Sequence, residues 1–155
     1  MFYGVIDQTP KKDILVVQGD WNAKVGRDAC GDWQGVCGPF CNDYTNERGL
    51  RLVEFASCND LVLANTFGHH KASRRWTWHI PNGQNHNQID YILVRKRFHS
   101  GVNIARTRRF AGADIGSDHD LLMMTFRLRL KNNNNNNNKN PASQNTKDSS
   151  LTLKR

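Results

Sequence analysis

Apolar and polar positions alternate along much of this chain in a way that predicts short β-strands. Residues 122–130 show this most clearly, because leucine, methionine or phenylalanine occupies every second position and arginines become frequent between them. Other runs rich in β-branched and aromatic residues predict further strands. These expected strands cover 14–18, 61–66, 75–80, 89–94 and 102–109.

One segment has the period of a helix instead. Asn46 is a suitable N-cap for a helix over 47–58, and Asn59 is a suitable left-handed terminator. The face expected to meet the core carries Leu50, Val53 and Ala56, joined by Leu52. Between the regular elements we expect a long loop over 26–44, a basic loop with two histidines over 67–75, and a turn at 81–83.

The order of these elements predicts the fold class. A strand and a helix are followed by several strands without alternating helices, which favours an α/β layered domain of the α+β type with a mostly antiparallel sheet. Seven asparagines (132–138) and a polar segment follow Lys131. Such a segment cannot bury enough apolar surface to fold. We therefore expect a domain over 1–131 and a disordered Asn-rich tail over 132–155.

The charge of the chain narrows the class of partner. The net charge is +8 at pH 7, and the basic residues form patches such as Arg74–Arg75, Arg95–Arg97 and Arg106–Arg109. Such an excess favours a polyanionic partner, of which nucleic acid is the commonest, although an ordinary basic protein surface gives the same composition.

The cysteines and the apolar runs indicate an intracellular protein. Cys30, Cys37, Cys41 and Cys58 do not have the spacing of a zinc site, so ordinary small residues are the simpler interpretation. No secretory signal opens the sequence, and no run of about 18 apolar residues could span a bilayer. We expect reduced thiols, no association with a membrane and a nuclear location.

Three short motifs place a carboxylate beside a predicted strand. They are GDWN with Asp20 and Asn22, QIDY with Asp90, and SDH with Asp118 and His119. Each aspartate alone would usually be a turn residue or a cap. Carboxylates gathered at one edge of a sheet repel one another, and a divalent cation offsets that repulsion. Oxygen ligands without thiolates suit Mg²⁺ or Mn²⁺.

His119 adds a group that can exchange protons or stabilise charge. A neighbouring carboxylate such as Asp90 would keep its ring positive toward a phosphate. A surface histidine beside a capping aspartate is the alternative.

The ordered motifs resemble the endonuclease/exonuclease/phosphatase superfamily, which includes DNase I-like nucleases and apurinic endonucleases. Within it, the chain is most similar to endonuclease domains of non-LTR retrotransposons and to craniofacial development protein 2-like sequences. The resemblance covers roughly residues 1–131. It is carried by GDWNAKVG (19–26), NERGLRLVEF (46–55), LVLANT (61–66), TW (77–78), NQIDYILV (87–94) and GADIGSDHDLL (112–122).

The resemblance implies a role for each motif residue. Asp20 would orient or deprotonate the attacking water, and Asn22 would contact the scissile phosphate. Asp90 would hold the catalytic His119, which stabilises charge on the phosphate. Asp118 would help bind the metal, with Asp20 beside it. Metal and imidazolium together would neutralise the transition state.

Nucleic-acid contacts are expected next to these motifs. Trp78 could reach a groove or stack on a base, although a core tryptophan is an equal alternative. Arg74 and Arg75 belong to the basic patch just before it, and Asn65 lies at another predicted strand end.

The resemblance also implies that only the C-terminal half of a four-layer α/β sandwich is present. Family members carry an N-terminal half with its own sheet and a metal-binding glutamate, and that half would be the natural structural partner of this chain. The expected function is Mg²⁺-dependent hydrolysis of DNA, impaired by the missing half. A non-catalytic remnant that binds nucleic acid is the alternative. A phosphoesterase of small molecules or lipids fits the basic patches less well.

Overall fold

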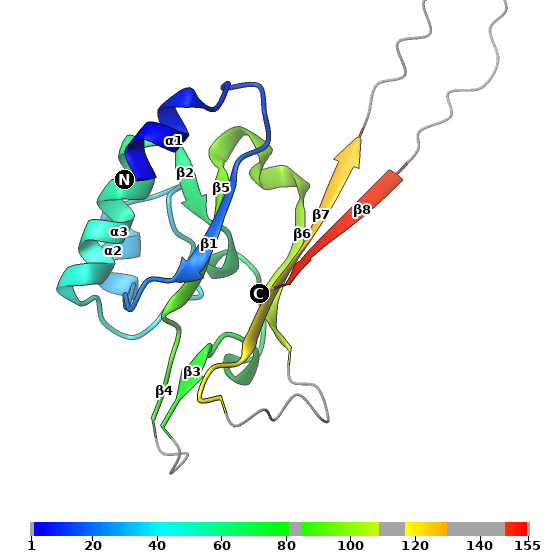
Figure 1. Cartoon of the computed structure of the whole chain (residues 1–155). Helices are drawn as coiled ribbons and strands as arrows, with labels where there is room; N and C mark the ends of the chain where they lie inside the picture. Colours follow the sequence, from blue (N-terminus) through cyan, green and yellow to red (C-terminus); the bar gives the residue numbers. More distant parts are fainter. Residues whose placement is uncertain (1, 81–84, 109–116, 130–147, 155) are drawn as a thin grey trace, which may run out of the picture.

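The computed structural model describes residues 2–80, 85–108, 117–129 and 148–154 and shows an α+β arrangement of helices and antiparallel sheets (Figure 1). The helices are α1 (Phe2–Gln8), α2 (Arg27–Asp32) and α3 (Glu47–Cys58), with 3₁₀ turns η1 (Ala64–Thr66), η2 (Ala72–Arg74) and η3 (Lys96–Gly101). The strands are β1 (Val16–Asp20), β2 (Leu61–Leu63), β3 (Trp78–His79), β4 (His86–Asn87), β5 (Asp90–Arg95), β6 (Val102–Arg108), β7 (Leu121–Arg129) and β8 (Asp148–Lys154). Among these described residues, no helix is long and apolar enough to cross a membrane.

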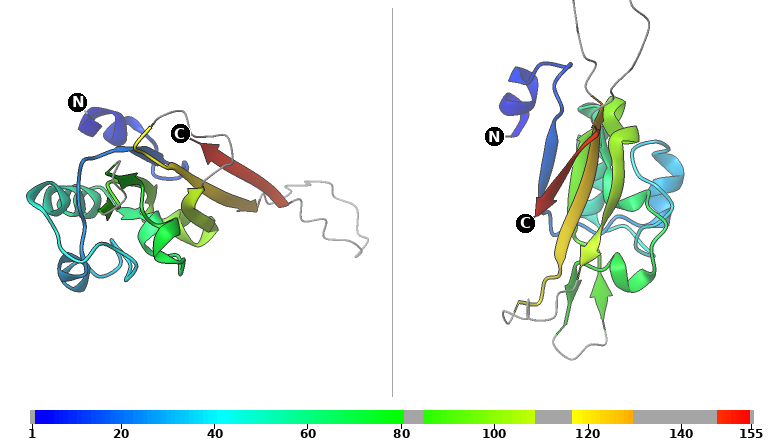
Figure 2. Two further views of the ribbon diagram at one scale, coloured as in Figure 1. Left: turned by 90° about the horizontal axis from the view of Figure 1, so that it is seen from below. Right: turned by 90° about the vertical axis from the view of Figure 1, so that its right-hand side faces the viewer.

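Two three-stranded sheets and a layer of helices build the body of the molecule (Figures 1 and 2). The first sheet has the order β1-β5-β2, and the second has the order β6-β7-β8. The short hairpin β3–β4 extends beyond one end of both sheets, as the right panel of Figure 2 shows. The expected mostly antiparallel sheet is therefore present, because every strand pair in both sheets and in the hairpin is antiparallel.

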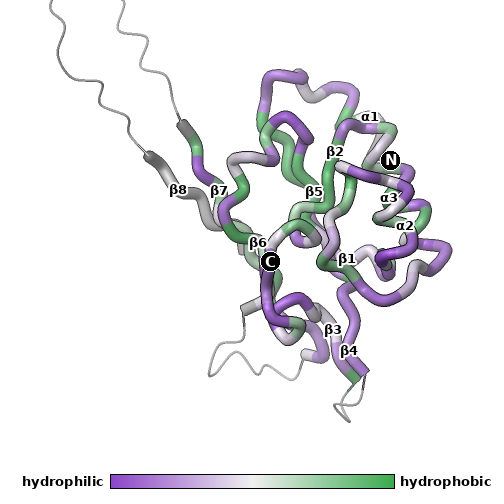
Figure 3. The backbone as a smooth tube through the Cα atoms, turned by 180° about the vertical axis from the view of Figure 1, so that it is seen from behind, coloured by the Kyte–Doolittle hydropathy of each residue, from purple (hydrophilic) through white to green (hydrophobic). Residues whose placement is uncertain are grey.

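Strand β5 is the centre of the core, because it is buried on both faces. Tyr91 and Leu93 face the helices and pack with residues of α2, α3 and β2. Ile92 and Val94 face the second sheet and pack against Met124 and its neighbours. This two-sided burial explains why the middle of the strand is a continuous apolar run in the sequence, drawn green in Figure 3.

Helix α3 confirms the predicted bounds and cap and corrects its predicted face. The side chain of Asn46 accepts a hydrogen bond from the backbone N–H of Gly49 at 2.7 Å, as an N-cap does. Leu50 is exposed rather than in the core, because the buried stripe runs through Gly49, Leu52, Val53 and Ala56. Asp60, not Asn59, takes the positive φ after the helix, at 55°.

Some expected loops and strands differ in the structure. The predicted loop over 26–44 contains α2, whose Ala29 and Cys30 are buried, so its one apolar turn is held by tertiary contact. The predicted strand over 61–66 is β2 followed by η1, and the predicted strand over 75–80 shortens to β3. The first residues form α1, a helix that no pattern in the sequence predicted. The predicted turn at 81–83 lies outside the described residues.

The end of the chain differs from the expected structureless tail. Residues 148–154 form β8, which pairs antiparallel with β7 over its whole length. The sequence there has leucine at alternate positions, 151 and 153, which suits a strand that covers the open edge of β7. The asparagine run lies outside the described residues.

Candidate functional site

Two of the three motif aspartates lie opposite one another on neighbouring strands, at the end of the first sheet where β1 stops and β5 begins. Strand β1 ends at Asp20 and β5 begins at Asp90, and the two are paired Cα partners in the antiparallel register. Beyond them, the backbone N–H of Trp21 donates to the carbonyl of Ile89 at 3.1 Å. The expected convergence of Asp20 and Asp90 is thus present, and pairing between the strands produces it.

Asp90 and His119 form a close pair. The His119 Nδ1 atom lies 2.9 Å from Asp90 Oδ2, with 3 % of the Asp90 side chain exposed and 29 % of the His119 side chain exposed. A buried carboxylate fixes the ring orientation, and a charged partner strengthens the hydrogen bond. The arrangement leaves Nε2 as the ring nitrogen not engaged with Asp90. The pair can therefore present one imidazole nitrogen, in a fixed direction, to a ligand.

Two buried polar residues hold the start of β5 in place. The Thr77 hydroxyl oxygen accepts hydrogen bonds from the backbone N–H groups of Ile89 and Asp90, at 2.9 and 3.0 Å. The Asn65 amide donates to the carbonyl of Asp90 at 3.2 Å and accepts from the N–H of Ile92 at 3.1 Å. Thr77 is a site residue that the sequence-based prediction missed, although its position directly before Trp78 in the TW motif was a usable signal.

The segment with the SDH motif is attached to β3 as a short extra strand. The N–H of His79 donates to the carbonyl of Asp118 at 3.0 Å, and the N–H of Asp120 donates to the carbonyl of Thr77 at 2.9 Å. An isolated bridge pairs Trp78 with His119. The hairpin β3–β4 therefore carries His119 to the edge where Asp90 begins β5.

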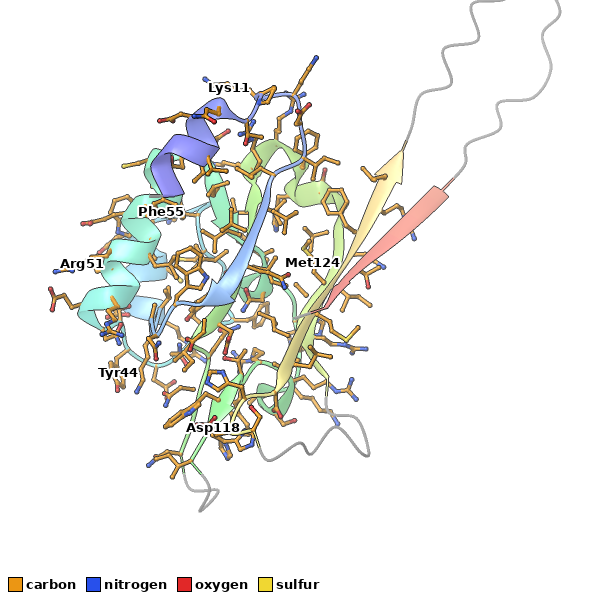
Figure 4. All side chains as sticks on the ribbon, viewed as in Figure 1. Lys11, Tyr44, Arg51, Phe55, Asp118 and Met124 are labelled. Atoms are coloured by element: carbon orange, nitrogen blue, oxygen red, sulfur yellow. The ribbon has the colours of Figure 1, made fainter. Side chains whose placement is uncertain are left out.

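Trp78 holds a carboxylate in the structure. Its indole Nε1 donates to Asp118 Oδ2 at 2.7 Å, and Asp118 is exposed near the hairpin (Figure 4). This hydrogen bond is the main cause that lowers the pKa of Asp118 below 3.8, opposed by loss of hydration and assisted by a backbone hydrogen bond and by His119 and His79. In the described conformation, the polar edge of Trp78 positions Asp118 rather than facing a nucleic-acid groove.

Asp20 and Asn22 form a compact unit of their own. The backbone N–H of Asn22 donates to Asp20 Oδ1 at 2.9 Å, and its side-chain amide donates to Oδ2 at 3.3 Å. Asn22 has φ of 48°, a left-handed conformation that asparagine tolerates better than most residues. The GDWN motif therefore folds into a turn that fixes the Asp20 carboxylate.

Of the residues predicted to contact nucleic acid in and next to the basic loop, some are exposed and others already bond backbone groups of the protein. Arg74 is exposed in η2. Arg75 is half-buried and its guanidinium donates to the carbonyl of Cys41 at 3.4 Å. Asn65 is 1 % exposed, and both of its amide atoms bond the backbone of β5. In this geometry Asn65 supports the strand that carries Asp90, which differs from the contact we expected it to make.

The donor set fits Mg²⁺ in kind. Asp118 and Asp20 offer hard carboxylate oxygens, and Mg²⁺ is often held by one or two carboxylates with water and substrate phosphate completing its shell. Among the described residues, no group of three or more His, Cys, Asp or Glu residues could hold a metal ion.

Trp78→Phe is expected to raise the pKa of Asp118 toward 3.8, because it removes the hydrogen bond that favours the carboxylate. The folded-state pKa is below the unfolded value, so the contribution to stability is present above pH 3.8 and is lost as pH falls through the folded pKa. Titration of the carboxyl carbon by NMR measures the shift. An unchanged midpoint in Trp78→Phe would show that the indole does not act on this carboxylate.

Comparisons with known proteins agree with the resemblance to craniofacial development protein 2-like sequences. No family model matches the sequence, and no solved structure matches it. Craniofacial development protein 2 of Tragulus javanicus is 46 % identical over 125 residues, which cover 81 % of this chain and 21 % of that protein. The Bos taurus protein is also 46 % identical over 125 residues and is covered to 20 %. The chain thus spans about a fifth of the length of these curated relatives, and over most of its own length it is similar to one part of craniofacial development protein 2.

Proposed function

We propose that this chain carries part of the active site of a Mg²⁺-dependent DNA endonuclease of the retroelement type, within a DNase I-like domain of the endonuclease/exonuclease/phosphatase superfamily. The observation that carries the proposal is the Asp90–His119 pair, 2.9 Å apart, next to the register partner Asp20. A buried carboxylate that orients an imidazole beside a second carboxylate is an arrangement suited to hydrolysis. The ordered motifs that resemble the superfamily supply the reaction class.

The side chains of the site would divide the work of phosphodiester cleavage. His119 would offer Nε2 to a phosphate oxygen and stabilise the negative charge that develops there, while Asp90 orients the ring. Asp20, fixed by Asn22, would position or deprotonate the attacking water. Asp118 and Asp20 would hold Mg²⁺, which neutralises phosphate charge when bound.

DNA is the proposed substrate because of the charge of the chain. The net charge of +8 and the exposed Arg74 close to β3 favour a long polyanion over a small phosphoester. A DNA substrate would place the protein in the nucleus. Because the chain spans a fifth of its relatives, the remaining ligands and the partner sheet would come from the rest of a longer protein.

A second candidate function is binding of nucleic acid without catalysis. It is favoured by the net charge of +8 and the exposed Arg74, which would attract a polyanion without a bound metal. The same basic surface would give salt-dependent binding to DNA without any loss of supercoiling.

A plasmid assay tests the first function against the second. We expect the protein to nick supercoiled plasmid with Mg²⁺, to stop nicking when a chelator is added, and to lose about 10²–10⁴-fold of its rate in Asp20→Ala. Asp43→Ala is the matched control, since Asp43 is exposed in the loop after α2. DNA binding that weakens with salt but produces no nick would reject catalysis and support the second function.

A further inference from the structure

Three of the four cysteines lie together in the interior. Cys30, Cys37 and Cys41 are 9 %, 4 % and 7 % exposed. All three belong to the part of the core in which Tyr91 and Leu93 of β5 pack with the helices. The Sγ atoms of Cys30 and Cys41 are 2.8 Å apart, and both are free thiols. Cys58, the remaining cysteine, is exposed at the end of α3. The sequence led us to expect ordinary small residues at these positions, whereas the structure brings two of the thiols into contact.

The backbone holds the pair in position. The N–H of Arg27 donates to the carbonyl of Asn42 at 3.2 Å, and the N–H of Asn42 donates to the carbonyl of Val25 at 3.0 Å. These bonds join the start of α2 to the residue that follows Cys41. The N–H of Cys30 continues the first turn of α2 by donating to Gly26 at 3.2 Å. This backbone pairing holds the two segments that carry Cys30 and Cys41 next to each other.

The surroundings of the two sulfurs are unequal. The hydrogen bond from Cys30 and the nearby charges of Arg75 and Arg27 lower the pKa of Cys41, against the opposing effects of burial and of Asp28. The Gly38 carbonyl accepts from Cys41 at 2.7 Å while that residue is a neutral thiol. Hydrogen bonds with Cys37 and Cys41 raise the pKa of Cys30. A thiolate is the reactive form of cysteine, and the lowered pKa of Cys41 favours its thiolate over that of Cys30.

We propose that Cys30 and Cys41 are a site of reversible oxidation, at which hydrogen peroxide converts the two thiols into a disulfide. The Cys41 sulfur attacks one peroxide oxygen, the O–O bond breaks, and the leaving hydroxide takes up the proton that Cys41 lost, giving water and a sulfenic acid. The Cys30 sulfur then attacks the Cys41 sulfur, the S–O bond breaks, and a second water leaves with the Cys30 proton. Two electrons pass from the sulfurs to the peroxide, and a dithiol reductant reverses the change.

The bond would connect α2 with the segment that supports β5. Asn42, next to Cys41, donates from its amide to the carbonyl of Gln88 at 2.9 Å and accepts from the N–H of Gln88 at 3.0 Å. Gln88 lies two residues before Asp90. Oxidation would therefore restrain the loop that carries Asn42, and through Gln88 the start of β5 at Asp90, whether or not the candidate site is catalytic.

Peptide mapping of the oxidised protein tests the proposal. In a Cys58→Ser background, the folded protein is treated with hydrogen peroxide, alkylated after denaturation, and cleaved after Trp33 and Phe40, which places each remaining cysteine in its own peptide. We expect two of the three thiols, Cys30 and Cys41, to lose their label and to be joined by a bond that dithiothreitol reverses. Cys37 is expected to keep its label.

Two serine variants and an unfolded control make the outcome decisive. Cys37→Ser is expected to form the same bond, whereas Cys41→Ser is expected to leave Cys30 free, with circular dichroism confirming that both fold. A bond that includes Cys37 would overturn the proposal. So would labelling of Cys30 and Cys41 that peroxide does not change, or equally fast bond formation in concentrated urea, since the fold is argued to build the pair.

Discussion

Replacing His119 with alanine is expected to lower the rate of plasmid nicking by about 10²–10⁴-fold, the range found when a positioned acid–base group is removed. The Asp90 carboxylate lies 2.9 Å from the ring and is 3 % exposed, so the variant removes the imidazole that this buried carboxylate orients. The variant should bind DNA with nearly unchanged affinity, because the basic residues remain. Initial rates with Mg²⁺ and a parallel binding titration measure the two effects.

A matched histidine variant and a partner variant complete this experiment. His99 lies in η3, which follows the other end of β5, and His99→Ala is expected to nick at the wild-type rate. Asp90→Asn keeps the size of the side chain but removes the charge that orients the ring, so it should lose rate with His119 still present. Nicking by His119→Ala at the wild-type rate would rule out the proposed role of the pair.

Asn65→Ala is expected to destabilise the protein strongly rather than to weaken DNA binding directly. The variant leaves the N–H of Ile92 without the partner that it has at 3.1 Å, and the carbonyl of Asp90 loses a donor at 3.2 Å. Each buried polar group left unsatisfied costs about 1–3 kcal/mol. The free energy of unfolding, measured by urea denaturation with circular dichroism, should fall by a corresponding amount.

An exposed asparagine provides the control for this variant. Asn103 is exposed in β6, and Asn103→Ala is expected to change the free energy of unfolding by less than about 0.5 kcal/mol. If Asn65 contacted DNA, as its place at a predicted strand end led us to expect, Asn65→Ala would weaken binding and leave the urea midpoint unchanged. That result would contradict the supporting role that the burial of Asn65 indicates.

Local patterns predicted the elements whose causes lie close together in the sequence. The cap at Asn46 and the length of α3 follow from a polar residue that can accept a backbone N–H three residues later. β5 and β7 follow from apolar runs and from alternation. The face of α3 was predicted less well. Leu50 was expected on the buried face and is exposed, because the stripe that packs against the core passes through its neighbour Gly49, about 100° away around the helix.

The same contrast holds for the candidate site. The motif letters alone selected Asp20, Asp90, Asp118 and His119, and the register of β1 with β5 and the bond to His119 then placed three of them together. The burial of Asn65 and the engagement of Trp78 with Asp118 could not be predicted from the sequence. Each depends on a side chain meeting a partner more than ten residues away.

The sequence by itself determined the α+β class, the strand over 89–94, the capped helix and the residue types of the site, because propensity, capping and periodicity act over a few neighbouring residues. Tertiary structure alone decided which polar groups are buried and paired. It formed α2 within an expected loop, brought Cys30 to within 2.8 Å of Cys41, and turned the Asp90 carboxylate to His119. These outcomes require the packing of distant segments, since only burial makes an unpaired polar group costly enough to fix its partner.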